Sequence, residues 1–104
     1  MTIQFNTDNN ITGSEELRAP LIALISEELG RFSQHVTRLE VHLSDQNGLK
    51  DGPNDIRCLL EARIEGRRPI AVTNQANTPE QAVEGAIDKL KTSLNTLIGR
   101  LRNH

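Results

Sequence analysis

Eight cationic side chains in the second half of this 104-residue chain are the residues whose type and spacing favour a particular chemistry. Residues 56–104 hold eight lysines and arginines against five acids, whereas residues 1–55 hold four against nine. Phosphate groups bind to cations that a rigid frame presents, with an affinity that falls as salt rises. The candidate phosphate-binding residues are Arg57, Arg63, Arg67, Arg68, Lys89, Lys91, Arg100 and Arg102. An ordinary solvated surface is the alternative interpretation for each of them.

Arg67 and Arg68 are the most pronounced pair of neighbouring cations. The segment Glu65-Gly66-Arg67 predicts a tight turn, because glycine adopts the backbone angles that such turns need. A turn would project both guanidinium groups outward beside a chain reversal. We therefore expect a continuous basic strip that joins this turn to the last helix.

No set of residues predicts catalysis. A nucleophile needs a base and an orienting group, and the chain shows no such arrangement. We therefore predict that the protein is not an enzyme and has no small-molecule substrate and no cofactor. Cys58 is the sole cysteine, which excludes an internal disulfide and a cysteine-based zinc site, and its place in an apolar alternation predicts a buried packing residue.

Metal binding is not predicted either. His35, His42 and His104 are scattered, and ordinary surface histidines are the preferred interpretation, with His42 in a polar binding face as the second one. The segment 45–52 begins like a calcium loop, but Leu49 and Lys50 occupy positions that need a ligand and a glycine.

The elements that would position the cations follow from hydrophobic periodicity. Alternating apolar residues predict strands, and apolar residues at steps of three and four predict helices. Thr12 or Ser14 is placed to cap the first helix, which contains Pro20, and Thr78-Pro79 is placed to begin the second. The expected elements are a strand over 2–6, a helix to about Phe32, strands over 37–44, 56–64 and 69–76, a loop over 45–55, and a helix from Thr78 to Leu101.

This β-α-β-β-β-α order predicts one domain over residues 1–104, a two-layer α/β sandwich with two helices on one face of a four-stranded mixed sheet. The first two strands should be parallel neighbours, and the rest an antiparallel meander. The second face of the sheet would be open to solvent. It should carry Arg38, Glu40, His42, Arg57, Leu59, Glu61 and Arg63.

Composition limits the partners further. Phe5 and Phe32 are the only aromatic residues, so stacking of bases on aromatic rings is nearly excluded as a binding mode. The N-terminus has neither the basic region nor the apolar run of a signal peptide, and no apolar stretch approaches the roughly 20 residues that span a bilayer. We expect a soluble cytoplasmic protein without a membrane partner.

Three short segments occur within this order of elements: Cys58-Leu59-Leu60-Glu61-Ala62-Arg63, Pro69-Ile70-Ala71-Val72-Thr73 and Ala86-Ile87-Asp88-Lys89-Leu90. With them, nearly the whole chain resembles the ribosome hibernation promoting factor family, also called ribosome-associated inhibitor or sigma modulation protein. The resemblance implies a fold like that of double-stranded-RNA-binding domains. It also implies binding to small-subunit rRNA in the mRNA and tRNA channel, with inhibition of translation in resting or stressed cells.

The resemblance carries over to single residues. Lys89 matches the lysine of the family's Asp-Lys-Leu segment, and Arg63 matches a basic position in the third strand. Lys91, Arg100 and Arg102 fall in a helix that is rich in lysine and arginine in the family. The chain departs from the family in its acidic first helix and in Thr92, Ser93, Asn95 and Thr96, which stand at positions expected to be basic or glutamine. We expect no counterpart of the C-terminal dimerisation domain of the long members.

A second function of a different class stays open. A divergent paralogue of the same fold would bind a protein partner or self-associate through the open sheet face. In that case Leu59 would be the apolar anchor, with Arg38 and His42 beside it.

Overall fold

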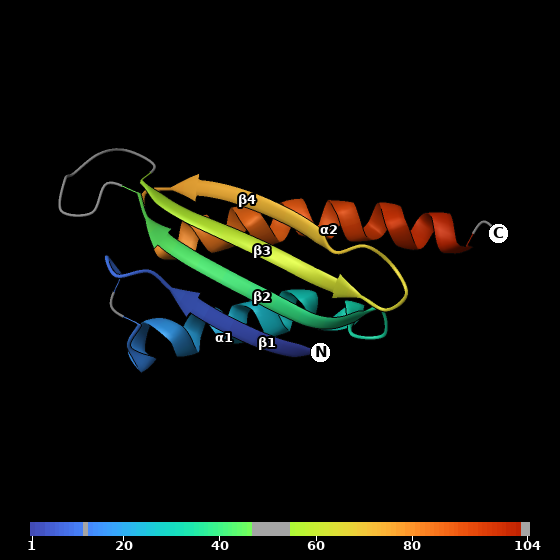
Figure 1. Cartoon of the computed structure of the whole chain (residues 1–104), viewed down its shortest axis with the longest axis horizontal. Helices are drawn as coiled ribbons and strands as arrows, with labels where there is room; N and C mark the ends of the chain where they lie inside the picture. Colours follow the sequence, from blue (N-terminus) through green and yellow to red (C-terminus); the bar gives the residue numbers. More distant parts are fainter. Residues whose placement is uncertain (12, 47–54, 103–104) are drawn as a thin grey trace.

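The structure of the chain is a computed structural model that describes residues 1–11, 13–46 and 55–102. Its elements follow the predicted order and confirm the predicted fold class (Figure 1). They are β1 (Thr2–Thr7), α1 (Glu15–Leu29), the 3₁₀ helix η1 (Gly30–Phe32), β2 (Val36–Asp45), β3 (Ile56–Ile64), β4 (Ile70–Ala76) and α2 (Pro79–Arg102). The predicted loop over 45–55 and the calcium interpretation of residues 45–52 fall mostly on 47–54, outside the described residues.

The four strands form one sheet in the order β1-β2-β3-β4. As predicted, β1 lies parallel to β2, whereas β3 pairs antiparallel with both β2 and β4. The register places Gln4 beside Glu40, and Glu40 beside Glu61. Side chains at paired positions point to the same face of a sheet, so three neighbouring strands present polar groups together.

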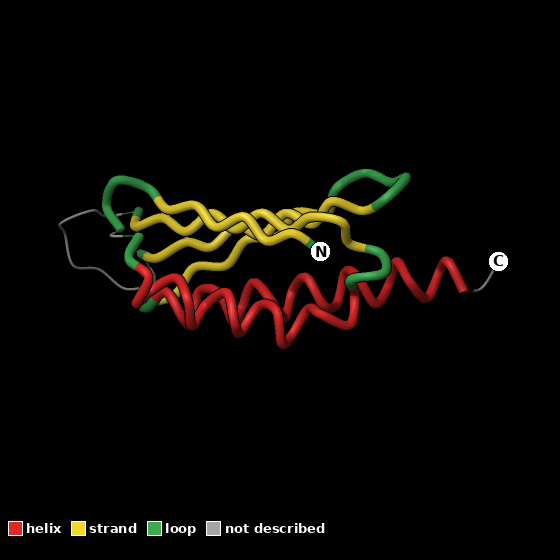
Figure 2. The backbone as a smooth tube through the Cα atoms, turned by 90° about the horizontal axis from the view of Figure 1, so that it is seen from below, coloured by secondary structure: helices red, strands yellow, loops and turns green. Residues whose placement is uncertain are grey.

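Both helices pack on one face of the sheet, and the opposite face carries no element of the described chain (Figure 2). The apolar stripe of α2 supplies the largest helical share of the core, through Val83, Ile87, Leu90 and Leu94. Strand residues such as Leu39 and Leu60 meet it with no exposed area. Burial of such side chains stabilises a domain by about 1.5–3 kcal/mol each. The core is aliphatic apart from Phe32 and Cys58.

The predicted helix starts are confirmed. The hydroxyl oxygen of Ser14 accepts a hydrogen bond from the Leu17 amide at 3.3 Å, and that of Thr78 accepts one from the Gln81 amide at 3.1 Å. Each bond satisfies an amide that the first turn leaves without a partner.

The end of the first helix differs slightly from its prediction. The α-helical part stops at Leu29, and the last three residues up to Phe32 tighten into η1. Such 3₁₀ turns are common at helix ends. Pro20 lies inside α1, which begins five residues earlier, so the helix continues through this proline.

Candidate nucleic-acid interface

The domain is elongated, with principal extents of 50 × 24 × 20 Å. All strands and both helices run roughly along the long axis, and the C-terminal part of α2 extends beyond the sheet (Figures 1 and 2). Segments 30–38, 63–70 and 95–102 meet at one end. At the opposite end, β1, β2 and β4 end and α1, β3 and α2 begin. Residues that are distant in sequence therefore gather at two poles.

These poles have opposite charge. The three segments of the first pole hold seven arginines and one acid, Glu65. We call this pole the basic end, and its described cations are Arg31, Arg38, Arg63, Arg67, Arg68 and Arg100. The described charged residues of the other pole, the acidic end, are the acids Asp8, Glu15, Glu16, Asp45, Asp55, Glu80 and Glu84 and the cations Arg18 and Arg57. A charge separation of this kind orients a protein toward a polyanion before contact.

Within the described residues, four arginines of the basic end make no ion pair: Arg31, Arg67, Arg68 and Arg100. All four are exposed. Guanidinium groups in this state keep their hydrogen-bond donors available and can form the paired contacts with phosphate oxygens that make arginine a common phosphate ligand.

The turn between β3 and β4 holds two of these arginines. The Arg67 amide donates to the carbonyl oxygen of Ile64 at 3.1 Å and closes the turn. Gly66 has a φ of 73°, which residues with side chains rarely adopt. Arg67 and Arg68 are exposed beyond it, which confirms the predicted tight turn but does not test a phosphate contact.

A shallow hollow of about 680 Å³ joins this turn to α2. Arg67 and Arg68 line it together with Gly66, Ile70 and Leu97. Arg100 lies three residues after Leu97, a spacing that places both on the same side of a helix. The structure thus brings together the turn and the last helix, as the prediction of a basic strip requires.

Other predicted residues are placed differently. The Lys89 ammonium donates to the carbonyl oxygen of Thr73 at 2.7 Å, and the Lys91 ammonium lies 3.3 Å from the carboxylate of Glu28. Both groups therefore have partners inside the domain. Arg57 is half-buried at the start of β3, at the acidic end and away from the arginines of the basic end. Arg102 is the last residue of α2, and its side chain lies outside the described residues.

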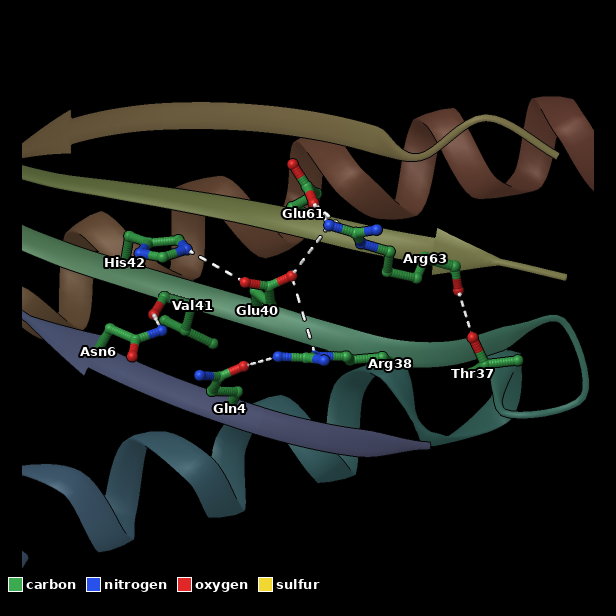
Figure 3. Close-up of polar contacts among 9 residues, drawn as sticks. All are labelled: Gln4, Asn6, Thr37, Arg38, Glu40, Val41, His42, Glu61 and Arg63. Carbon is green, nitrogen blue, oxygen red and sulfur yellow. Dashed lines mark hydrogen bonds and ion pairs between the residues drawn. The ribbon is translucent and has the colours of Figure 1, made fainter.

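The open sheet face carries a network centred on Glu40 (Figure 3). Its carboxylate lies 3.5 Å from Arg63, 3.7 Å from His42 and 3.9 Å from Arg38. Arg63 also meets Glu61 at 3.1 Å, and Arg38 donates to the side-chain oxygen of Gln4. Arg38 and Arg63 are thus balanced by two carboxylates.

Leu59 also lies on the open face, where it pairs with His42 of β2 and Thr73 of β4. Its side chain is half-buried among these neighbours. Among the described residues, Met1 is the one large apolar side chain that is exposed. The interaction face predicted around Leu59, Arg38 and His42 therefore stays a prediction.

Arg31 and His35 were not predicted as site residues. Arg31 lies in η1 and His35 follows it, and both line one hollow together with residues of α2 at the basic end. Their sequence neighbourhood is the acidic half of the chain, so local charge gave no signal. Only the crossover from α1 to β2 brings them to the pole that the last helix and the β3–β4 turn occupy.

The cysteine thiol, the metal-ligating side chains and the hydropathy of the helices bear on functions other than nucleic-acid binding. The Cys58 thiol is fully buried, and this burial raises its pKa to about 12, so it is a neutral packing residue as predicted. In residues 1–11, 13–46 and 55–102, no three metal-ligating side chains gather into a possible site. No helix of this part of the chain has the length and apolar character needed to cross a membrane.

The fold and the unpaired arginines define a small α/β domain with one basic end. The family model described as sigma 54 modulation protein / S30EA ribosomal protein matches residues 7–102, and the chain belongs to this family. This confirms the resemblance drawn from the sequence.

Solved structures show the same fold. The N-terminal domain of Thermus thermophilus Protein Y has a TM-score of 0.67 and 18% sequence identity, covering 93% of this chain and 99% of that one. A ribosomal subunit interface protein from Coxiella burnetii has a TM-score of 0.66 and 17% identity, covering 95% and 99%. No curated protein sequence is significantly similar to this chain.

Proposed function

We propose that this protein associates with the small ribosomal subunit, binds its rRNA in the channel used by mRNA and tRNA, and inhibits translation in resting cells. Membership of a family described as ribosomal supports association with the ribosome, as does the likeness in fold to a ribosomal subunit interface protein. The observation that carries the proposal is the basic end, with four described arginines that no carboxylate neutralises.

The proposed binding depends on charge and shape rather than on base sequence. Arg67 and Arg68 extend from a closed turn, and Arg100 extends from the helix beside it, so the cations are held on rigid elements. A rod with a cross-section of 24 × 20 Å would fill a channel while its basic end contacts phosphates. The acidic end would face away from rRNA, because like charges repel.

The test is sedimentation of the full chain with purified small ribosomal subunits through a density gradient at 50 and 300 mM salt. We expect co-sedimentation at low salt and release at high salt, since phosphate contacts release counterions. Replacement of both Arg67 and Arg68 by alanine should abolish co-sedimentation at intermediate salt. Replacement of both Arg18 and Arg57 by alanine removes the same amount of charge, but at the acidic end. This control variant should still co-sediment with the subunit.

Two outcomes would contradict the proposal. If the wild-type protein stays with free protein at low salt, it does not bind the subunit. If both double variants lose binding equally, net charge rather than the basic end determines association. Circular dichroism of each variant establishes that the domain is folded.

A further inference from the structure

A second hollow lies at the basic end, on the other side of α2 from the β3–β4 turn. It has a volume of about 370 Å³ and separates η1 and the segment after it from the C-terminal half of the helix. Its lining residues combine cationic, amide and apolar groups: Arg31, Phe32, Gln34, His35, Asn95, Ile98 and Gly99. Arg31 and His35 belong to neither of the predicted sets of site residues.

Arg31 is held in a defined place in this hollow. Its guanidinium carbon lies 4.5 Å from the centre of the Phe32 ring, a cation–π contact. Phe32 itself is 2% exposed and cannot receive a ligand. A guanidinium plane that covers an aromatic ring on one side can stack on a flat group with the other, which is one way in which proteins hold unstacked RNA bases.

Gly99 is a separate observation at the same place. Glycine inside a helix lowers the stability of the helix by about 1 kcal/mol relative to alanine. A glycine at such a position is therefore readily explained where a neighbouring group leaves no room for a side chain. Gly85 of the same helix has such a neighbour, because a side chain at this position would overlap Asn74. A Cβ at Gly99 would meet no atom within 4 Å. No described contact requires this glycine, and its missing side chain enlarges the hollow.

We propose that this hollow binds a single unstacked nucleotide of RNA, with its base stacked on Arg31. Ile98 would pack against the base, and the amides of Asn95 and Gln34 with the imidazole of His35 would meet its polar edges. Unpaired arginines across α2 would hold the neighbouring phosphates. The inference rests on the proposed RNA binding and refines it, because it predicts a preference for RNA with an extruded nucleotide over a continuous duplex.

Fluorescence anisotropy of five labelled RNA hairpins tests the inference with the full chain. One hairpin is fully paired, and the other four are identical to it except for a single bulged nucleotide, one hairpin for each base. We expect the wild type to bind at least one bulged hairpin about tenfold more tightly than the paired one, a factor within the range that stacking of one base provides.

Two variants separate the hollow from general electrostatics. G99L fills the hollow without a change of charge, and R31K keeps the charge but removes the planar group. Both should lose the preference for the bulge, and G99L should bind the paired hairpin as the wild type does. G99A, which adds one methyl group, and R18K, at the acidic end, are the matched controls and should retain the preference.

The results distinguish this inference from the proposed function. Equal wild-type affinity for paired and bulged hairpins would overturn the nucleotide site and leave RNA binding in place. Retention of the preference in G99L would also overturn it. No binding to any hairpin at 50 mM salt would also overturn the nucleotide site, and co-sedimentation with the subunit then decides the proposed function separately. A titration with the four mononucleotides shows whether the ligand is a free nucleotide or a nucleotide within RNA. Saturation at micromolar concentration would assign the hollow to a free nucleotide instead of RNA.

Discussion

Glu28 of α1 and Lys91 of α2 form an ion pair that joins the two helices, with 3.3 Å between Oε1 and Nζ. The side chains are 41% and 25% exposed, so the pair is partly shielded from water. Lys91 was predicted to bind phosphate, yet its charge is already matched by a carboxylate of the acidic first helix. An anionic ligand would have to displace this carboxylate before it could bind Lys91.

This pair leads to the first prediction. Glu28→Gln keeps the shape of the side chain and removes the competing charge, so Lys91 becomes available to phosphate. We expect affinity for small-subunit rRNA to rise by roughly two- to tenfold at 100 mM salt, which corresponds to about one added phosphate contact. Filter binding measures the change. The free energy of unfolding should fall by only about 0.2–1 kcal/mol, since the pair is partly exposed.

The control for this variant is Glu27→Gln. Glu27 is exposed, lies next to Glu28 in the sequence and makes no ion pair in the described part of the chain. Glu27→Gln should change the affinity for rRNA much less than Glu28→Gln does. An equal gain in both variants would show that the net charge of α1, and not the release of Lys91, sets the affinity.

A second prediction concerns the dependence of RNA binding on salt. If Arg67 and Arg68 each neutralise a phosphate, their joint replacement by alanine should lower the slope of log K against log salt concentration by about two. Binding measured between 50 and 250 mM salt gives this slope. An unchanged slope with weaker binding would mean that these arginines shape the turn without touching phosphate.

The Cys58 thiol yields a prediction about pH. Burial raises its pKa from 9.0 to about 12, so the folded protein holds this proton where the unfolded chain releases it. The stability contributed by the neutral thiol is therefore complete below pH 9 and is lost as pH rises from 9 toward 12. By pH 10 the loss should be on the order of 1 kcal/mol.

Urea unfolding of the wild type and of Cys58→Ala between pH 7 and pH 10 isolates this effect. Other groups also titrate in this range, but they are common to both proteins, so only the difference between the two curves matters. Above pH 9, the difference in the free energy of unfolding between the wild type and Cys58→Ala should shrink. A constant difference across this range would refute the assignment of the slope to Cys58.

The sequence predicted the fold well because its signals are local. The hydroxyl groups of Ser14 and Thr78 cap their own helices, and the alternation of Leu39, Val41 and Leu43 decides which face of β2 is buried. Each signal depends on a few consecutive residues. The order of the elements then left few ways to build a sheet covered by two helices.

The site was harder to predict because it depends on contacts between distant segments. Arg57 and Arg63 share one strand, but a rise of about 3.3 Å per residue places them roughly 20 Å apart, at opposite poles. The partners of Lys89 and Lys91 lie on β4 and α1, which no local pattern reveals. Arg31 reaches the basic end from the acidic half of the chain for the same reason.

The two glycines inside α2 give a last prediction, in which the same substitution has opposite effects. The side-chain amide of Asn74 in β4 donates to the carbonyl oxygens of Gln81 and Ala82, at 3.4 and 3.2 Å, and occupies the space next to Gly85. Gly85→Ala would displace this amide and break both hydrogen bonds. The expected cost is about 1–3 kcal/mol, which exceeds the gain of up to about 1 kcal/mol from better helix propensity.

Gly99→Ala has no such cost, because its methyl group would meet no atom within 4 Å, so the domain should become more stable by up to about 1 kcal/mol. Urea unfolding at pH 7 measures both variants. In the Asn74→Ala background, Gly85→Ala should no longer destabilise, since the overlapping group is gone. If Gly85→Ala stabilised the wild type instead, the sheet and helix would not be packed at the distance that the Asn74 hydrogen bonds require.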